Sequence, residues 1–346
     1  MPDEYRRFQR DPPGPRSRSK RLKNWARAGI LLATILGLAL AAWTFGVNGW
    51  RDIVGVAARM GVAGFLLVCV YSVFTFAMLG AAWVAAASEA PARLALFTWG
   101  RLVREAASDL LPFSQIGGIV IGMRTLVARG IPPARAYASF VVDLTTEMAA
   151  QLLFTIFGLA LMATILVGDG ADLLRPAILG GTGILAAMIL AIFLGQRALL
   201  AFATRLAHRF VPGSAAAMAD IETELARLYG RRRSVALALL LNLAAWVQSA
   251  AGAWLILKLV EIPFSFWAAL SLESLIFTLR SVAFAIPGAL GVQEVAYALA
   301  GPLFGLGPEA ALALALAKRA RDLTVALPTL IVWQASETRA ILKGAR

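Results

Sequence analysis

Residues 280–322 read RSVAFAIPGALGVQEVAYALAGPLFGLGPEAALALALAKRARD, and this stretch decides the fold. An apolar segment is interrupted at Pro287 and again near Gly305. Proline ends helices because it lacks an N–H and clashes with the preceding turn, and glycine tolerates left-handed dihedral angles. The next apolar segment carries Lys318 and Asp322. At membrane depth, non-helical backbone and charged side chains are tolerated only where they are buried in protein or line a water-filled cavity. The stretch therefore predicts a functional site.

The composition is that of an integral membrane protein. The 346 residues are 60% hydrophobic and only 15% charged, with a mean hydropathy of +0.74. A soluble domain carries roughly a quarter charged residues. Several stretches reach the length of about 20 apolar residues that a membrane span requires. The net charge of +13 favours basic cytoplasmic loops that touch anionic lipid headgroups, and we expect no nucleic-acid partner.

The inventory of reactive side chains is small. Cys69 is the single cysteine and His208 the single histidine of the sequence. A lone cysteine excludes a disulfide within the chain and a cysteine-based metal site. No nucleotide-binding loop or nucleophile elbow is present in the sequence. We therefore expect no metal, no cofactor and no catalytic residue.

The chain divides into a basic disordered segment, two membrane repeats and a basic tail. The expected boundaries are 1–24, 25–167, 168–338 with a cytoplasmic loop at 196–233, and 339–346. The expected membrane spans are 28–46, 61–87, 134–167, 176–195, 234–258, 264–286 and 309–335. Two short amphipathic helices are expected at the membrane surface, over 50–60 and 218–229.

Helix-breaking and acidic residues recur at one spacing, which predicts an internal duplication. Pro112 and Pro287 are 175 positions apart (287 − 112). The same offset relates Gly130 to Gly305, Pro133 to Pro308, and Glu147 to Asp322. Because the basic N-terminal segment is expected in the cytoplasm and loop 168–175 outside, the halves are expected to be inverted. The sequence thus predicts an all-α polytopic membrane protein, with two inverted repeats and broken or re-entrant helices around a polar central cavity.

Charged and polar residues of both broken segments form the candidate site. A lipid phosphate inside the bilayer requires counter-charges, and arginine offers a planar fork of donors. We expect a headgroup site formed by Arg280, Lys318, Arg319, Arg321, Asp322, Glu273, Gln293, Glu294, Ser114 and Gln115. In the alternative interpretation, the cations pair internally with Asp322, Glu273 and Glu294 and only hold the helices together. The breaks are expected at Pro112, Gly117, Gly118, Pro287, Gly288 and Gly291.

Asp143 and Glu147 form a second candidate feature. They lie four residues apart and so share one face of a helix. One hypothesis makes them a proton relay that couples transport to a proton gradient. The other makes them ion-pair partners of Arg101, Arg104 or Arg124.

Residues 280–322 and the earlier stretch LLPFSQIGGIVIGMRTLVARGIPPARAYASFVVDLTTE resemble one known family. It is the lysylphosphatidylglycerol synthase transmembrane-region family, also called flippase-like, and the resemblance covers about residues 25–340. The wording RSVAFAIPGALGVQE is closest to the hopanoid-biosynthesis-associated HpnL-type membrane proteins. The resemblance implies lipid handling. The soluble aminoacyl-lipid synthase domain of larger members has no counterpart within these residues, so that activity is not expected.

The expected function is therefore binding and translocation of a lipid, a hopanoid or a charged phospholipid, across the inner membrane without chemistry of its own. The alternatives are a membrane-embedded enzyme or a scaffold in lipid (hopanoid) biosynthesis. The expected partners are membrane lipids and a second copy of the chain, since the small residues of 309–317 permit close helix packing. The expected location is the bacterial inner membrane, with both termini in the cytoplasm.

Overall fold

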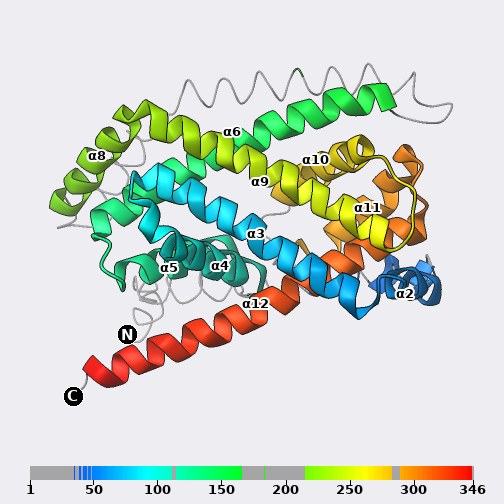
Figure 1. The fold of residues 1–346 in the computed structure, drawn as a ribbon, viewed down its shortest axis with the longest axis horizontal. Coiled ribbons are helices and arrows are strands. Elements are labelled where there is room, and N and C mark those ends of the chain that lie inside the picture. The colour runs from blue at the N-terminus through cyan, green and yellow to red at the C-terminus, as the bar shows by residue number, and fades with distance from the viewer. Residues whose placement is uncertain are drawn as a thin grey trace, which may run out of the picture.

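The computed structural model describes residues 49–110, 114–165, 215–282 and 289–344, with a few isolated positions before residue 49 and at residue 183. Every element in these ranges is a helix (Figure 1). The helices are α2 (Trp50–Ala58), α3 (Gly61–Ala87), η1 (Pro91–Arg93), α4 (Leu94–Leu110), α5 (Ser114–Val127), α6 (Pro133–Ile165), α8 (Ala215–Gly230), α9 (Arg232–Leu259), α10 (Phe266–Val282), α11 (Val292–Ala300), η3 (Gly301–Phe304) and α12 (Pro308–Gly344).

Three of the described helices are long and apolar enough to cross a membrane, namely α3, α6 and α9. The outer faces of the helices are strongly apolar. Val70 and Ile331 are each 68% exposed, and Phe74 and Leu240 are each 61% exposed. Large apolar side chains exposed in such numbers indicate a surface covered by lipid hydrocarbon rather than by water. The prediction of an all-helical membrane protein is therefore confirmed.

Helices α3 and α9 lie side by side and run in opposite directions (Figure 1). Gly64 at the start of α3 faces Leu259 at the end of α9. Midway along the pair, the Tyr71 hydroxyl donates a hydrogen bond of 3.0 Å to the Gln248 carbonyl oxygen. A Cβ atom at Gly252 of α9 would lie 3.2 Å from the Tyr71 ring, so a glycine there allows the two helices to approach closely, as small residues commonly do between membrane helices.

The two longest helices begin in the same way, as the spacing of 175 predicted. Gly130 and Gly305 have φ angles of 89° and 78°, in the left-handed region that favours glycine. Three residues after each glycine, Pro133 and Pro308 are the first residues of α6 and α12. Proline suits this first position, where its missing N–H has no helical partner in any case. The predicted breaks before these helices are confirmed.

Each long helix packs across the molecule, α6 against α10 and α12 against α4. On the first contact, Ser271 donates a hydrogen bond of 2.6 Å to the Gly158 carbonyl oxygen. Helix α12 also reaches α2, where Ile53 packs with Leu312 and Ala313. The contacts of α6 and α12 therefore join early and late parts of the chain into one body.

The far end of α12 lies against α5. Trp333 donates a hydrogen bond of 3.0 Å from its indole Nε1 to Thr125 Oγ1. Arg124 pairs with Glu337 at 2.7 Å. The sequence predicted a span ending at 335, but α12 continues to Gly344. Beyond residue 335, Glu337 is held by its ion pair with Arg124 of α5, so the helix extends past its apolar part.

One predicted break is wrong. Helix α5 runs through Gly117 and Gly118 without interruption. A Cβ atom at Gly118 would overlap the side chain of Ser108 and the carbonyl oxygen of Arg104 on α4. The glycine therefore allows α5 to pack closely on α4, and its helix-breaking tendency is overridden by this tertiary contact.

Several predictions fall outside the described residues. These are Pro112, Pro287 and Gly288, the segment 1–24, the spans 28–46 and 176–195 apart from isolated positions, the loop 168–175 and most of the loop 196–233.

The adjacent glycines of α5 give a matched pair of substitutions. Gly118→Ala should destabilise the protein by about 1–3 kcal/mol, because the added methyl group overpacks the contact with α4. Gly117→Ala meets nothing within 4 Å and should be neutral or stabilising by up to about 1 kcal/mol, since alanine is the better helix former. Thermal unfolding of both variants in one detergent checks this. Equal midpoints would contradict the packing role of Gly118.

Candidate functional site

Charged side chains gather inside the helical body in two ion-pair networks. Isolated charges in low dielectric are very costly, so buried charges occur in pairs with hydrogen bonds. The first network joins α4 to α6, and the second joins α10, α11 and α12. A cleft between α3, α4 and α12 lies between the charged residues of α4 and those of α12.

The first network holds two arginines of α4 against two acids of α6. Arg101 donates to Asp143 at 3.2 Å and to both carboxylate oxygens of Glu147. Arg104 reaches the same two acids, at 3.4 Å and 3.0 Å. Arg101 is 1% exposed and Asp143 is 0% exposed. This arrangement matches the interpretation of Asp143 and Glu147 as ion-pair partners, while their role as a proton relay stays a prediction.

Polar neighbours extend this network along α6. Asn242 of α9 donates a hydrogen bond of 3.2 Å to the Thr146 hydroxyl, and both residues are buried. Tyr229 at the end of α8 donates one of 2.9 Å to the Thr145 hydroxyl. Helix α6 is therefore held by polar contacts from α4, α8 and α9, in addition to those from α3 and α10.

The second network is centred on Glu273 of α10. Lys318 of α12 and the Tyr297 hydroxyl of α11 both donate to its carboxylate. Lys318 also donates a hydrogen bond of 2.8 Å to the Tyr297 hydroxyl oxygen. Lys318 is 2% exposed and Glu273 is 0% exposed. The three side chains thus close a triangle that links three helices at the second broken segment.

Glu294 ties the start of α11 to α12. Its carboxylate accepts a hydrogen bond of 2.8 Å from the backbone N–H of Gly291, the residue before the helix. It also accepts one of 2.9 Å from Arg319. Gly291 has a φ angle of 77° and directly precedes α11, while its role as a hinge stays a prediction. The acid caps a helix N-terminus, where a negative charge is favourable.

The cleft is narrow, with room for about one water molecule, and its lining is of mixed character. Its charged side chains come from Glu105 and Asp109 of α4 and from Arg321 and Asp322 of α12. Arg280 of α10 approaches Asp109 to 3.9 Å, and both side chains are partly exposed. Its apolar side chains are Phe76, Leu102, Ala106, Val325 and Ala326. The lining therefore combines the two kinds of side chain that contact the two parts of an amphipathic ligand.

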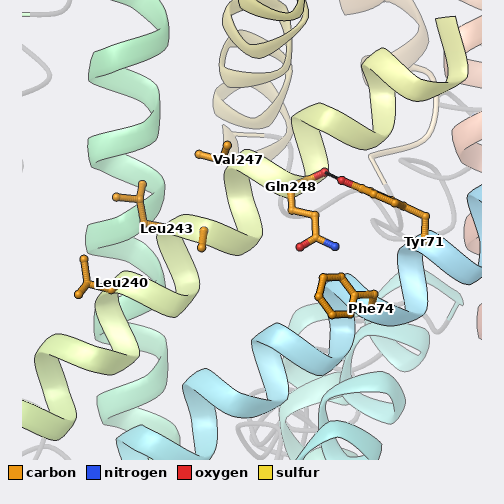
Figure 2. A pocket seen from close by; sticks show the side chains of 7 residues that line it. Tyr71, Phe74, Leu240, Leu243, Val247 and Gln248 are labelled. Atoms are coloured by element: carbon orange, nitrogen blue, oxygen red, sulfur yellow. Dashed lines mark hydrogen bonds between the residues drawn. The ribbon is translucent and has the colours of Figure 1, made fainter. Parts of the chain in front are cut away.

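A second, open hollow lies between α3 and α9, as Figure 2 shows. Apolar side chains line most of it, among them Phe74, Leu243 and Val247. The Gln248 side chain projects into this region, and its buried Nε2 has no hydrogen-bond partner among the described residues (Figure 2). The sequence offered no sign of this feature, because a glutamine within an apolar helix has no local pattern to mark it.

The structure brings together most of the predicted site residues. Lys318, Arg319, Glu273 and Glu294 meet in the second network, while Arg321, Asp322 and Arg280 lie at or beside the cleft. Gln293 is 1% exposed at the first turn of α11. Ser114 and Gln115 begin α5, and their side chains are not described. The role of these residues in binding stays a prediction.

Sequence reasoning missed two members of the site. Tyr297 lies three residues after Glu294, on the same face of α11, and this spacing is the signal that points to it. Asp109 was visible only as one of several charges on α4, which the sequence predicted to be too polar to face lipid.

The fold and the buried charges together define an all-helical membrane protein with an ion-paired interior. Comparison with protein families shows a match to the Lysylphosphatidylglycerol synthase TM region over residues 29–330. The chain therefore belongs to this family, as its resemblance predicted. Searches of the curated proteins and of the solved structures found no match.

Arg101→Ala tests the first network. The substitution leaves two buried acids with one arginine between them, and breaking such a pair costs about 3–5 kcal/mol. Arg124→Ala is the control, because Arg124 is 58% exposed in its ion pair and should contribute about 0–1 kcal/mol. Thermal unfolding in one detergent should show a much lower midpoint for Arg101→Ala alone. Similar midpoints for the two variants would show that the buried network does not stabilise the fold.

Proposed function

We propose that this protein binds the polar headgroup of a membrane lipid at the cleft and moves the lipid between leaflets without changing it chemically. The cleft lining, which combines charged and apolar side chains of α3, α4 and α12, is the observation that carries the proposal. In this proposal the helices move apart to admit the headgroup. Membership of a family named for the membrane region of a lipid synthase supports a lipid-related role.

Arg280 is the cation best placed to receive a headgroup. Among the described residues, Lys318 and Arg319 each bind a buried acid, and Arg321 binds Asp322. Arg280 makes only a 3.9 Å contact with Asp109, and its side chain is 24% exposed. A phosphate can accept two hydrogen bonds from such a guanidinium. The attraction between the two charges is stronger in the low dielectric of a membrane interior than in water. An anionic headgroup is therefore the preferred ligand.

We further propose that the two halves are inverted repeats around this site. The antiparallel packing of α3 on α9 supports this arrangement. The long helix of each half also packs on the short helix of the other half, α6 on α10 and α12 on α4, and this supports the same arrangement. Inverted repeats with interrupted helices place the substrate near the middle of the bilayer. In this proposal the site lies in the bacterial inner membrane, both termini are cytoplasmic, and the protein is able to pair with a second copy.

Two lipids remain candidates within this proposal. A charged phospholipid fits the arginines beside the cleft. A hopanoid is suggested by the sequence of residues 280–294, which resembles the HpnL-type membrane proteins. A hopanoid with a polar extension would place its ring system against the apolar side chains of the cleft.

Leaflet transfer of a fluorescent lipid tests the proposal directly. Vesicles containing the purified protein and a phosphatidylglycerol labelled on one acyl chain should show faster loss of fluorescence to an impermeant quencher than empty vesicles. Arg280→Ala should reduce the protein-dependent rate at least about tenfold, the effect of losing roughly 1.4 kcal/mol of headgroup binding in the transition state. Arg124→Ala, an exposed arginine outside the cleft, should transfer at the normal rate. Unchanged transfer by Arg280→Ala would contradict the assigned site.

Deletion of the gene in its host separates transport from enzymatic or scaffolding roles. Under the proposal, total lipid composition stays constant while the share of one lipid in the outer leaflet or outer membrane changes. Loss of a specific lipid together with accumulation of its precursor would instead support a membrane-embedded enzyme or a scaffold. Quantitative lipid analysis of whole cells and of separated membranes, hopanoids included, distinguishes these outcomes.

A further inference from the structure

Within the described ranges, the ion pairs of the two networks and of the cleft include one more acid than cations. Their cations are Arg101, Arg104, Arg280, Lys318, Arg319 and Arg321, which gives six positive charges. Their acids are Glu105, Asp109, Asp143, Glu147, Glu273, Glu294 and Asp322, which gives seven negative charges. An uncompensated charge in a low dielectric is costly, so a proton or a bound cation relieves the excess most directly.

Asp109 is the least compensated of these acids. Asp143, Glu147, Glu273, Glu294 and Asp322 each accept a hydrogen bond from a cationic side chain. Glu105 has Arg101 at 3.0 Å. The nearest cation to Asp109 is Arg280 at 3.9 Å, beyond hydrogen-bonding distance. No hydrogen bond to the Asp109 carboxylate occurs among the described residues.

The surroundings of Asp109 add negative charge. Glu105 lies one turn earlier on α4, and Asp322 faces the same cleft from α12. The cations near it are Arg280 of α10 and Arg321 and Arg319 of α12, of which the last two already bind Asp322 and Glu294. Helix α3 contributes Phe76 and contains no charged residue. Helix α5 has Arg124 as its one charged residue, and this pairs with Glu337.

We propose that Asp109 is a proton-binding residue. During the lipid cycle, a proton and the Arg280 guanidinium alternate as the positive partner of its carboxylate. The inference rests on the proposed function and adds a co-substrate to the same site. When Asp109 takes a proton from water in the cleft, its attraction for Arg280 is lost and the guanidinium is available to an anionic headgroup. When the headgroup leaves, Asp109 returns the proton to water and attracts Arg280 again. No covalent bond other than the O–H bond forms or breaks.

This exchange keeps the interior charge constant. The proton adds one positive charge as the headgroup adds one negative charge, so the loaded and empty states carry the same net charge. Keeping the net charge constant avoids the large cost of moving an uncompensated anion into the low-dielectric interior. A proton gradient then biases the direction of lipid movement, because loading takes up a proton on one side and unloading releases it on the other.

Infrared difference spectroscopy tests proton binding without reference to transport. Spectra of the purified full-length protein in lipid nanodiscs are compared between about pH 8 and about pH 6, a range in which ordinary carboxyl groups with pKa values of about 4 stay ionised. Wild type should gain a carbonyl band of a protonated carboxylic acid at the lower pH, and Asp109→Asn should lack it. The control is Asp52→Asn, which changes an exposed acid of α2 and should retain the band. Absence of the band in wild type, or its persistence in Asp109→Asn, would overturn the proposal.

Asp109→Glu covers the case in which Asp109→Asn does not fold. A band that belongs to residue 109 should shift in frequency when the side chain lengthens, whereas a band of any other acid stays in place and refutes the assignment. The fluorescent phosphatidylglycerol assay is then repeated at both pH values. Transfer should depend on pH in wild type and lose at least about threefold of that dependence in Asp109→Glu or Asp109→Asn, and an unaltered pH profile would overturn the coupling. If the band assigns to residue 109 but no labelled lipid moves, the proton site stands and the transport proposal falls.

Discussion

The structure depends on the ion pairs that stabilise the buried charges of α4 in an otherwise apolar interior. Arg101 and Arg104 are buried, and a buried guanidinium is tolerated only with acids close enough to bind it. Asp143 and Glu147 supply those acids from one face of α6. The pairing fixes α4 against α6 in one register, because a shift of one residue would turn the acids away. The placement of the cleft follows, since Glu105 and Asp109 continue the same face of α4.

In the second half of the chain, a short helix is also bound to a long one by a buried ion pair, but the signs of the charges are reversed. There the short helix α10 carries the acid Glu273, and the long helix α12 carries the cation Lys318. Tyr297 joins them from α11, the short helix that follows the second break. Both halves therefore bind a short helix to a long one through buried charge. Asp109, which lines the cleft, and Arg280 beside it lie outside these closed networks, and the proposed site uses these two side chains.

Local chemistry made much of the fold predictable. The bounds 61–87 of α3 followed from an uninterrupted apolar run, and the starts of α6 and α12 followed from Gly130, Gly305 and the prolines three residues later. The break expected at Gly117 and Gly118 was wrong, because close packing on α4 overrides the helix-breaking tendency of glycine.

The sequence predicted most of the residues of the site, but it did not predict which of them form ion pairs with one another. Lys318, Arg319 and the acids Glu273 and Glu294 were all expected, yet spacing along one helix does not show which cation binds which acid. Those pairs form between helices, and only the tertiary arrangement of α10, α11 and α12 determines them. Asp109 gained its importance in the same way, from the absence of a close cation rather than from any local pattern.

Helix α12 links the membrane interior to the region beyond it. Its 37 residues extend about 55 Å, whereas the hydrocarbon core of a bilayer is about 30 Å thick. Near its beginning it presents Lys318 to the second network, and near its end Trp333 and Glu337 hold it to α5. A tilt of this helix when the cleft fills would act as a lever and swing its outer end through a larger arc. A probe attached near Thr338 would therefore report the state of the cleft from outside the bilayer.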